Sequence, residues 1–271
     1  MQKKTGVLLV NLGTPDNPYP PAVRKYLNQF LTDPRVLDIP WLNRQLLVRL
    51  LISPFRSRSS GKTYEQIWNK ETGSPLLFHS KNLLSGVQAL IEKHNTPNHK
   101  FVVELAMRYQ EPSMEAALER LKKEHLHELI VIPLFQQYAS ASSGSVMEHT
   151  MKIISDWLYI PELKIISSFH LRPEMIEVFA ANARKYNLAE YDHFLFSFHG
   201  LPQRQLIKTN INNHCYSTPD CCKNLCEKNH SCYGAQSYET AKAIANKLDI
   251  PDSKYSVSFQ SRLGKDPWTQ P

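Results

Sequence analysis

Residues 101–134, FVVELAMRYQEPSMEAALERLKKEHLHELIVIPL, decide the fold class of this chain. The stretch opens with an apolar run at 101–106 and closes with another at 129–134, and each run predicts a buried strand. Between them, Ser113–His125 carries apolar residues at helical spacing, with Ser113 as the expected N-cap. A strand, a helix and a second strand in this order predict two parallel strands joined by a helix.

The same alternation continues on both sides of this stretch, over a chain of 271 residues. Further apolar strands are predicted at 6–12, 163–169, 193–198 and 255–259, and helices at 146–158, 173–186 and 237–248. This pattern favours an α/β fold in which parallel sheets are covered by helices on both faces. We expect two domains, residues 1–160 and 161–271, with the boundary near Pro161.

Composition and charge exclude several classes of protein. No apolar run approaches the roughly 18 residues of a transmembrane helix, and the N-terminus lacks the pattern of a signal peptide. A cytoplasmic location is therefore expected. The net charge of +7 fits an acidic partner, or simply a basic globular protein. The basic residues are scattered and form no recognisable nucleic-acid-binding motif, so nucleic acid is not an expected partner.

The segment 41–60 departs from the alternating pattern, because its apolar side chains are interspersed with arginines. One interpretation is an amphipathic helix that packs into the core. The other is a hydrophobic lip that meets an apolar ligand or a membrane surface. The sequence leaves both open.

Ligands in parallel α/β sheets bind beyond the carboxyl ends of the strands, where the loops 13–17, 136–145 and 199–203 are expected. The first loop lacks the G-x-G-x-x-G pattern of a dinucleotide site. The small residues at 142–145 either cap a helix or cradle an anionic group. His199, at a predicted strand end, can accept a proton or bind a metal near neutral pH, although such a histidine is often only structural.

All five cysteines fall between Cys215 and Cys232. An odd, clustered set in a chain without an export signal favours a metal or cluster site over disulfides. We expect Cys215, Cys222, Cys226 and Cys232 to be the ligands, with Cys221 as an alternative. Four thiolates in one loop suit a [2Fe–2S] cluster. Zinc is less favoured because no C-x2-C pair occurs, and free thiols are the third alternative.

Residues 196–202, FSFHGLP, closely resemble the signature of ferrochelatases, the enzymes that complete haem synthesis. Further resemblances follow in the family's order over essentially the whole chain: LLVNLGTP at 8–15, the segment 64–75 ending in Gly-Ser-Pro, MRYQEP at 107–112, the loop 133–145, and the stretch 261–271.

The resemblance implies two Rossmann-like, chelatase-type domains with a porphyrin cleft between them. It implies insertion of Fe(II) into protoporphyrin IX to form protohaem, with His199 as the catalytic histidine, acting as proton acceptor or as ligand of the Fe(II) substrate. It places six further residues near the macrocycle or the iron path: Leu12, Arg108, Tyr109, Gln110, Tyr138 and Ser142.

Two segments acquire expected roles from the same resemblance. The segment 41–60 becomes a hydrophobic lip through which porphyrin arrives from a membrane surface, which predicts a location peripheral to the inner membrane. The cysteine insert, residues 214–233, lies where some bacterial ferrochelatases carry a [2Fe–2S] cluster. The expected partners are protoporphyrin IX, ferrous iron and a membrane surface.

The resemblance departs from the family at Trp268–Pro271. Family members continue through a further strand and helices, which hold an acidic residue facing the catalytic histidine. We therefore expect an incomplete second domain and very low metal insertion by the chain as written, compared with a version of restored length. Two alternatives stay open, a coproporphyrin III ferrochelatase and a porphyrin- or haem-binding protein without turnover. A cobalt or nickel chelatase is disfavoured by the ordered set of motifs.

Overall fold

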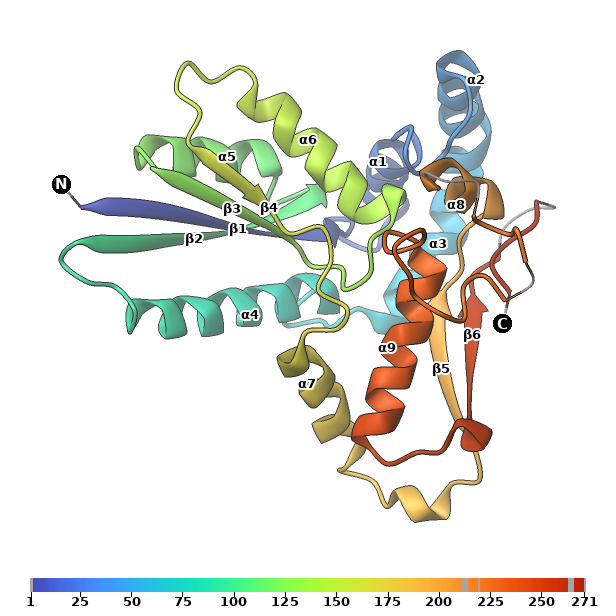
Figure 1. The fold of residues 1–271 in the computed structure, drawn as a ribbon. Helices are drawn as coiled ribbons and strands as arrows, with labels where there is room; N and C mark the ends of the chain where they lie inside the picture. Colours follow the sequence, from blue (N-terminus) through green and yellow to red (C-terminus); the bar gives the residue numbers. More distant parts are fainter. Residues whose placement is uncertain (1, 211–213, 219, 263–265, 271) are drawn as a thin grey trace. The chain divides into compact units, whose positions relative to one another are not determined.

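The structure is a computed structural model of the chain and describes residues 2–210, 214–218, 220–262 and 266–270 (Figure 1). The chain divides into two compact units. The first consists of Met1–Phe135 and Ala141–Ser167, and the second of Gln136–Ser140 and Ser168–Pro271. Each unit is described by itself below, and the domains expected from the sequence stay a prediction.

The first unit is built on a four-stranded parallel sheet in the order β2-β1-β3-β4. Its strands are β1 Lys3–Gly13, β2 His99–Tyr109, β3 Glu128–Pro133 and β4 Glu162–Ile165. The predictions of the first three strands and of an α/β fold with parallel strands are confirmed. The fourth strand ends at Ile165, short of the predicted residue 169, after pairing with Val131 of β3.

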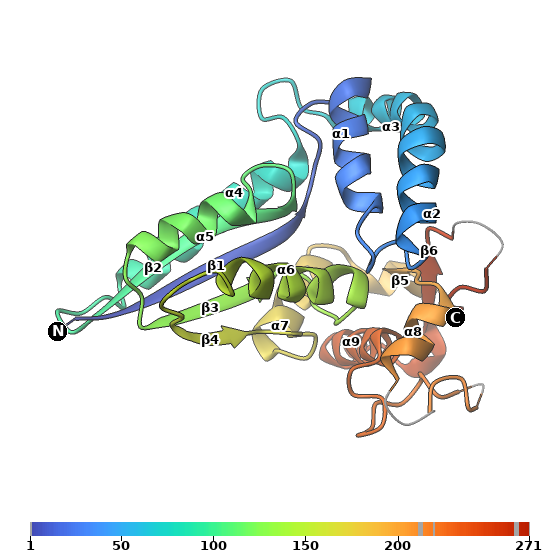
Figure 2. The same cartoon turned by 90° about the horizontal axis from the view of Figure 1, so that it is seen from above.

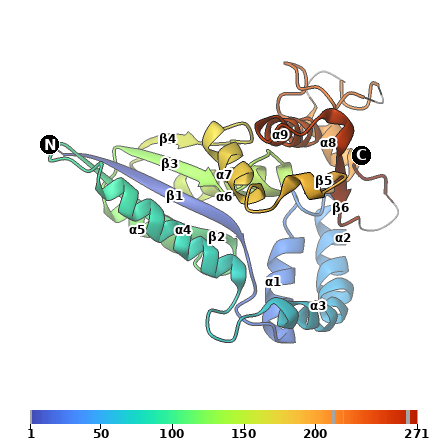
Figure 3. The same ribbon diagram turned by 90° about the horizontal axis from the view of Figure 1, so that it is seen from below.

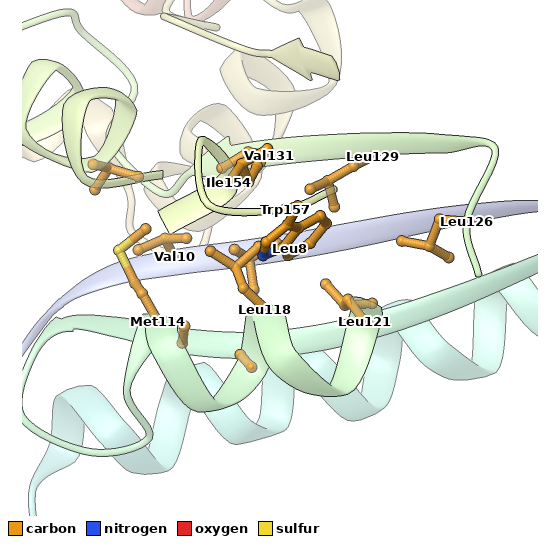
Figure 4. Close-up of a cluster of buried hydrophobic side chains, with 13 residues drawn as sticks. Leu8, Val10, Met114, Leu118, Leu121, Leu126, Leu129, Val131, Ile154 and Trp157 are labelled. Carbon is orange, nitrogen blue, oxygen red and sulfur yellow. The ribbon is translucent and has the colours of Figure 1, made fainter. Parts of the chain in front are cut away.

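Helices cover both faces of this sheet. Helix α4 (Pro75–Glu92) runs along one face, whereas α5 (Met114–Lys123) and α6 (Ser145–Ile154) cover the other (Figures 1 and 3). The core beneath α5 and α6 contains Leu8, Leu118 and Trp157 (Figure 4). A second core lies between the opposite face of the sheet and α4. The strands carry apolar side chains on both faces, so the sheet is buried on both sides.

The predicted N-cap of α5 is confirmed, since Ser113 Oγ accepts a hydrogen bond from the backbone N–H of Ala116 at 3.3 Å. Helix α6 ends at Ile154 rather than at the predicted residue 158. The chain turns there and places Trp157 in the core, with 8 % of its surface exposed. Burial of a large aromatic side chain thus decides where this helix stops.

Four helical segments of the first unit pack together: α1 (Pro20–Leu31), α2 (Trp41–Leu46), the π-helix η1 (Leu47–Ile52) and α3 (Ser53–Ile67) (Figure 2). Six apolar side chains of the segment 41–60 are at least half exposed: Trp41, Leu42, Leu46, Leu50, Leu51 and Phe55. A core helix would bury them. The exposed face favours the interpretation as a lip, which we call the 41–60 lip below.

The second unit contains two parallel strands, β5 (Phe194–His199) and β6 (Tyr255–Gln260). Its helices are α7 (Pro173–Ala183), α8 (Gln203–Thr209) and α9 (Tyr233–Lys247), of which α7 and α9 pack against each other. The short helical turns η3 (Leu188–Glu190) and η4 (Asp252–Lys254) also belong to this unit, whereas η2 (Ser140–Gly144) lies mostly in the first. Within the described residues, none of the helices combines the length and apolar character needed to cross a bilayer.

Candidate active site

The carboxyl edge of the first sheet brings together residues from β1 and β2. Gly13 pairs with Tyr109 across the two strands and has φ +111. A Cβ at this position would lie 1.9 Å from the backbone oxygen of Tyr109. Glycine is therefore required here, and its lack of a side chain lets the end of β1, with the half-buried Leu12, lie close to the end of β2.

A buried carboxylate, Asp33, organises this edge. Its Oδ2 accepts hydrogen bonds from Arg108 Nη2 at 2.8 Å, Tyr109 Oη at 2.9 Å and Ser145 Oγ at 2.6 Å. Asp33 follows α1, Arg108 and Tyr109 end β2, and Ser145 begins α6, so three segments of the chain meet at one oxygen atom. An ionised carboxylate can be buried in this way because a guanidinium and two hydroxyls replace its water shell.

Tyr109 is fully enclosed, with 1 % of its surface exposed. Burial raises the pKa of its phenol above the ordinary value, and the negative charge of Asp33 raises it further, while Arg108 opposes the shift. The phenol is therefore protonated at neutral pH, and its O–H donates to Asp33. Tyr109 is thus enclosed by protein and cannot contact a ligand at the surface. Arg108 can do so, because 14 % of its side chain is exposed.

Gln110 and Ser142 also lie at this edge. Gln110 has φ +69, and both its backbone N–H and its side-chain Nε2 donate to Gln29 Oε1, at 2.9 and 2.5 Å. Its Oε1 is buried without a hydrogen-bond partner among the described residues, as is the hydroxyl of Ser143. Ser142 itself lies in η2, immediately before α6. Unpaired buried polar atoms of this kind are typical of sites that take water or a ligand.

His199 is the last residue of β5 and lies on its exposed face, opposite Gln260 of β6. Desolvation by the surrounding protein atoms lowers the pKa of its imidazole. Among the described residues, no charged group contributes to this shift. The ring is therefore neutral at neutral pH and partly open to solvent, the state that a proton acceptor or a metal ligand requires.

The loop that follows His199 is held by the end of the described chain. The backbone N–H of Gly200 donates to Gln260 O at 2.7 Å, and a Cβ on Gly200 would lie 2.8 Å from that oxygen. Leu201 and Thr269 exchange two hydrogen bonds, from Leu201 N to Thr269 Oγ1 at 3.0 Å and from Thr269 N to Leu201 O at 2.9 Å. These contacts fix the direction in which β5 presents His199.

Tyr138 belongs to the second unit, where Gln236 of α9 holds it. The backbone N–H of Tyr138 donates to Gln236 Oε1 at 2.7 Å, and Gln236 Nε2 donates to the carbonyl of His230 at 2.7 Å. Tyr138 shares the lining of one hollow with Leu201 and Tyr233. The backbone of His199 hydrogen-bonds the hydroxyl of Tyr233, whose pKa burial raises to about 12. Tyr138 and His199, the two residues of this unit that were predicted to lie near the macrocycle, thus share α9 as their support.

The cysteine insert gathers four of its five thiols. Cys221 Sγ and Cys222 Sγ lie 3.6 Å apart, Cys222 Sγ and Cys232 Sγ lie 4.0 Å apart, and Cys215 hydrogen-bonds Cys232. Those thiol contacts, and the backbone N–H groups that begin α9, lower the pKa of Cys232. Cys226 is exposed, and its Sγ lies 4.0 Å from His214 Nε2. Within the described ranges, no three or more His, Cys, Asp or Glu side chains are arranged to hold a metal ion.

Comparison with known proteins identifies the family. The family model described as ferrochelatase matches residues 4–271. The chain belongs to the ferrochelatase family. The ferrochelatase of Legionella pneumophila (strain Corby) is 42 % identical over 268 residues, which cover 99 % of this chain and 77 % of the relative. The ferrochelatase of Coxiella burnetii (strain Dugway 5J108-111) is 43 % identical over 270 residues, which cover 99 % of this chain and 73 % of the relative.

Membership of the ferrochelatase family confirms the resemblance drawn from the motifs, and the structure adds residues that the motifs did not point to. Asp33, Ser145, Tyr233 and Gln236 contact the predicted site residues directly. No local sequence pattern points to these four residues, because their contacts join segments that are far apart in the chain. The roles of the predicted site residues stay predictions.

Proposed function

We propose that this ferrochelatase inserts Fe(II) into protoporphyrin IX, the last step of haem synthesis. The observation that carries the proposal is His199, a neutral and partly exposed imidazole at the end of β5 within the FSFHGLP segment. Metal insertion requires two pyrrolic N–H protons to leave as one Fe(II) enters, so the reaction needs a base beside the ring. A neutral histidine is suited to that role at physiological pH.

His199 can accept a proton or bind Fe(II), but one lone pair cannot do both at once. We propose that it is the proton acceptor. Its depressed pKa keeps the lone pair available, and its exposure allows the proton to pass on to solvent. A cleft that holds the porphyrin distorted would expose the pyrrole lone pairs to the metal, with strain supplied by binding energy elsewhere on the ring.

The test is a stopped metal-insertion assay with Fe(II), in which protoporphyrin IX and coproporphyrin III are compared by product analysis. We expect the protein to metallate protoporphyrin IX faster, and His199→Ala to lose most of this activity. Near-wild-type insertion by His199→Ala would contradict the assigned base. Faster turnover of coproporphyrin III would favour the alternative substrate. Tight porphyrin binding without insertion, by the chain and by a version of restored length alike, would favour a binding protein.

We also propose that the 41–60 lip meets a membrane surface from which the porphyrin arrives. Support comes from its six exposed apolar side chains and from the exposed arginines Arg49, Arg56 and Arg58 beside them. Apolar side chains can enter the acyl region while arginines pair with anionic headgroups. Arg44 is not one of these flanking charges, because it is buried and donates to the carbonyls of Thr32 and Ile39 at 2.9 and 2.6 Å.

We propose that the cysteine insert holds a [2Fe–2S] cluster. The donor chemistry fits, because thiolates are the ligands of such clusters and the insert gathers four thiols. Their grouping supports Cys215, Cys221, Cys222 and Cys232 as ligands, with Cys221 in place of Cys226. Binding requires the four sulfurs to close around the cluster. When bound, the cluster would supply an iron-thiolate cross-link and a one-electron redox centre.

Visible absorption and iron content after anaerobic purification test the cluster. We expect Cys221→Ala to lose both signals and Cys226→Ala, the matched control, to keep them. The reverse result would restore Cys226 as a ligand. A colourless protein that contains zinc would exclude the cluster, and a colourless protein without metal would identify free thiols.

A further inference from the structure

We propose that Asp33 is a positioning residue of the metal-insertion reaction and that it acts through Arg108. The proposal rests on the function proposed above and adds a residue that lies outside every motif of the sequence. Asp33 itself is 7 % exposed, so it does not offer a surface to substrate. Asp33 therefore has to act through a neighbouring side chain that reaches the surface.

Both carboxylate oxygens of Asp33 are fixed. Oδ2 accepts from Arg108, Tyr109 and Ser145, while Oδ1 accepts the backbone N–H of Arg35 at 2.7 Å. The carbonyl of Asp33 accepts from the backbone N–H groups of Val36 and Leu37 at 3.1 and 3.0 Å. A carboxylate anchored at its backbone and at both oxygens is a rigid support for the groups that donate to it.

Arg108 is the neighbour that reaches the surface. Its Nη2 donates to Asp33, its Nε donates to Ser145 Oγ at 2.8 Å, and the guanidinium lies 4.7 Å from the centre of the Tyr109 ring. Among the described residues, Nη1 has no hydrogen-bond partner. Two donors of the planar guanidinium are therefore fixed, and in the proposed role Nη1 is available to donate to an oxygen-bearing group of the substrate.

Asp33 also sets the hydrogen-bonding roles of Tyr109 and Ser145. Each hydroxyl donates its single proton to the carboxylate. Ser145 Oγ then uses a lone pair to accept from Arg108 Nε. Removing the negative charge would release these donors and leave the guanidinium without its counter-ion. The four side chains consequently form one hydrogen-bonded cluster. In this cluster Asp33 fixes the orientation of the guanidinium, and Arg108 offers that guanidinium to the substrate.

If Asp33 had only a structural role, its substitution would change the stability of the protein but not the rate of metal insertion. Another buried carboxylate of the first unit, Glu128, provides a matched control. Glu128 lies at the opposite edge of the first sheet and is 6 % exposed, close to the value for Asp33. It pairs with Lys164 Nζ at 2.5 Å and accepts from Thr5 Oγ1 at 3.3 Å. Neither partner belongs to the candidate site. Glu128→Gln thus removes a buried, ion-paired carboxylate that lies outside the candidate active site.

The experiment compares Asp33→Asn with Glu128→Gln for Fe(II) insertion into protoporphyrin IX and for thermal stability. We expect Asp33→Asn to lower kcat/KM at least about tenfold, and Glu128→Gln to stay within about twofold of wild type. Both variants should have lower melting temperatures. Insertion by Asp33→Asn within twofold of wild type would overturn the proposal, as would an equal loss in Glu128→Gln. Absence of insertion in the wild-type protein, both in the chain as written and at restored length, would contradict the proposed function as well.

A double-mutant cycle tests whether Asp33 acts through Arg108. We expect Arg108→Gln combined with Asp33→Asn to be no less active than Arg108→Gln alone, because the carboxylate has nothing left to position. The double variant also removes both members of the buried ion pair, which costs less stability than removing one and provides a folded protein if Asp33→Asn alone unfolds. Additive losses of activity would show that Asp33 does not act through Arg108.

Discussion

At the scale of single residues, the site depends on positions where a change of one atom has a large effect. Gly13 is one, because its left-handed backbone and its close approach to Tyr109 exclude any side chain. Asp33 is another, since one carboxylate oxygen receives three donors. The physical reason is the same in both cases: a buried position offers no room or solvent to compensate.

We predict that Gly13→Ala destabilises the protein by more than the ~1–3 kcal/mol of a strained backbone, because the new Cβ also overlaps the Tyr109 backbone. Gly86→Ala in α4 is the control. A Cβ there meets nothing within 4 Å, so this change should stabilise by ~0.5–1 kcal/mol. Denaturant unfolding measures both, and equal effects would show that the contact with Tyr109 is not decisive.

The pKa of His199 predicts the pH dependence of turnover. Burial lowers this pKa below the ordinary value of about 6.5, and only the neutral ring accepts a proton. The rate of metal insertion should therefore be constant above that lowered pKa and fall as the pH drops through it. The measurement is kcat as a function of pH.

His193→Gln is the control for this profile, because His193 lies just before β5, where it hydrogen-bonds Ser256 at 3.0 Å. We expect its profile to match that of the wild-type protein. An acid limb above pH ~6.5 would mean that a different group, or a His199 with a raised pKa, controls the reaction.

At the scale of elements, the 41–60 lip combines a buried frame with an exposed apolar face. Val48 is fully buried and Arg44 bonds to neighbouring carbonyls, so the π-helix and its flanks are held from inside. Leu50 and Phe55 are 63 % and 74 % exposed. A framed apolar surface of this kind can enter a bilayer without rearranging the fold.

We predict that Leu50→Gln and Phe55→Gln each weaken binding to anionic lipid vesicles about tenfold or more, since burying one such side chain is worth ~1.5–3 kcal/mol. The free energy of unfolding should change by less than ~0.5 kcal/mol, because both sites are exposed. Leu90→Gln, at a residue 60 % exposed in α4, is the matched control and should leave binding unchanged. Vesicle sedimentation gives the comparison, and equal loss in all three variants would argue against a specific lip.

At the scale of the whole molecule, the apolar core is unevenly distributed between the two units. Both identified clusters of buried apolar residues lie in the first unit, above and below its four-stranded sheet. In the second unit, α9 buries mainly small residues, among them Ala235, Ala241 and Ala245. Its described sheet has only two strands, and a sheet of that size is marginal without further packing.

We predict that the fragment 1–167 unfolds cooperatively on its own, whereas the fragment 168–271 does not, because apolar burial supplies most of the stability of a domain. Circular dichroism during denaturant titration measures each fragment. A cooperative transition in 168–271, or its absence in 1–167, would contradict the uneven distribution of stability.

The sequence by itself determined the alternation of strands and helices, the N-cap at Ser113 and the family, because these depend on local periodicity and on contiguous motifs. It did not determine which residues complete the site. Asp33 meets Arg108 and Ser145 across separations of 75 and 112 residues, and no local pattern records such a contact. The exposure of the 41–60 lip and the grouping of Cys221 with Cys222 and Cys232 were likewise decided by tertiary structure, since packing determines which side of each segment is buried.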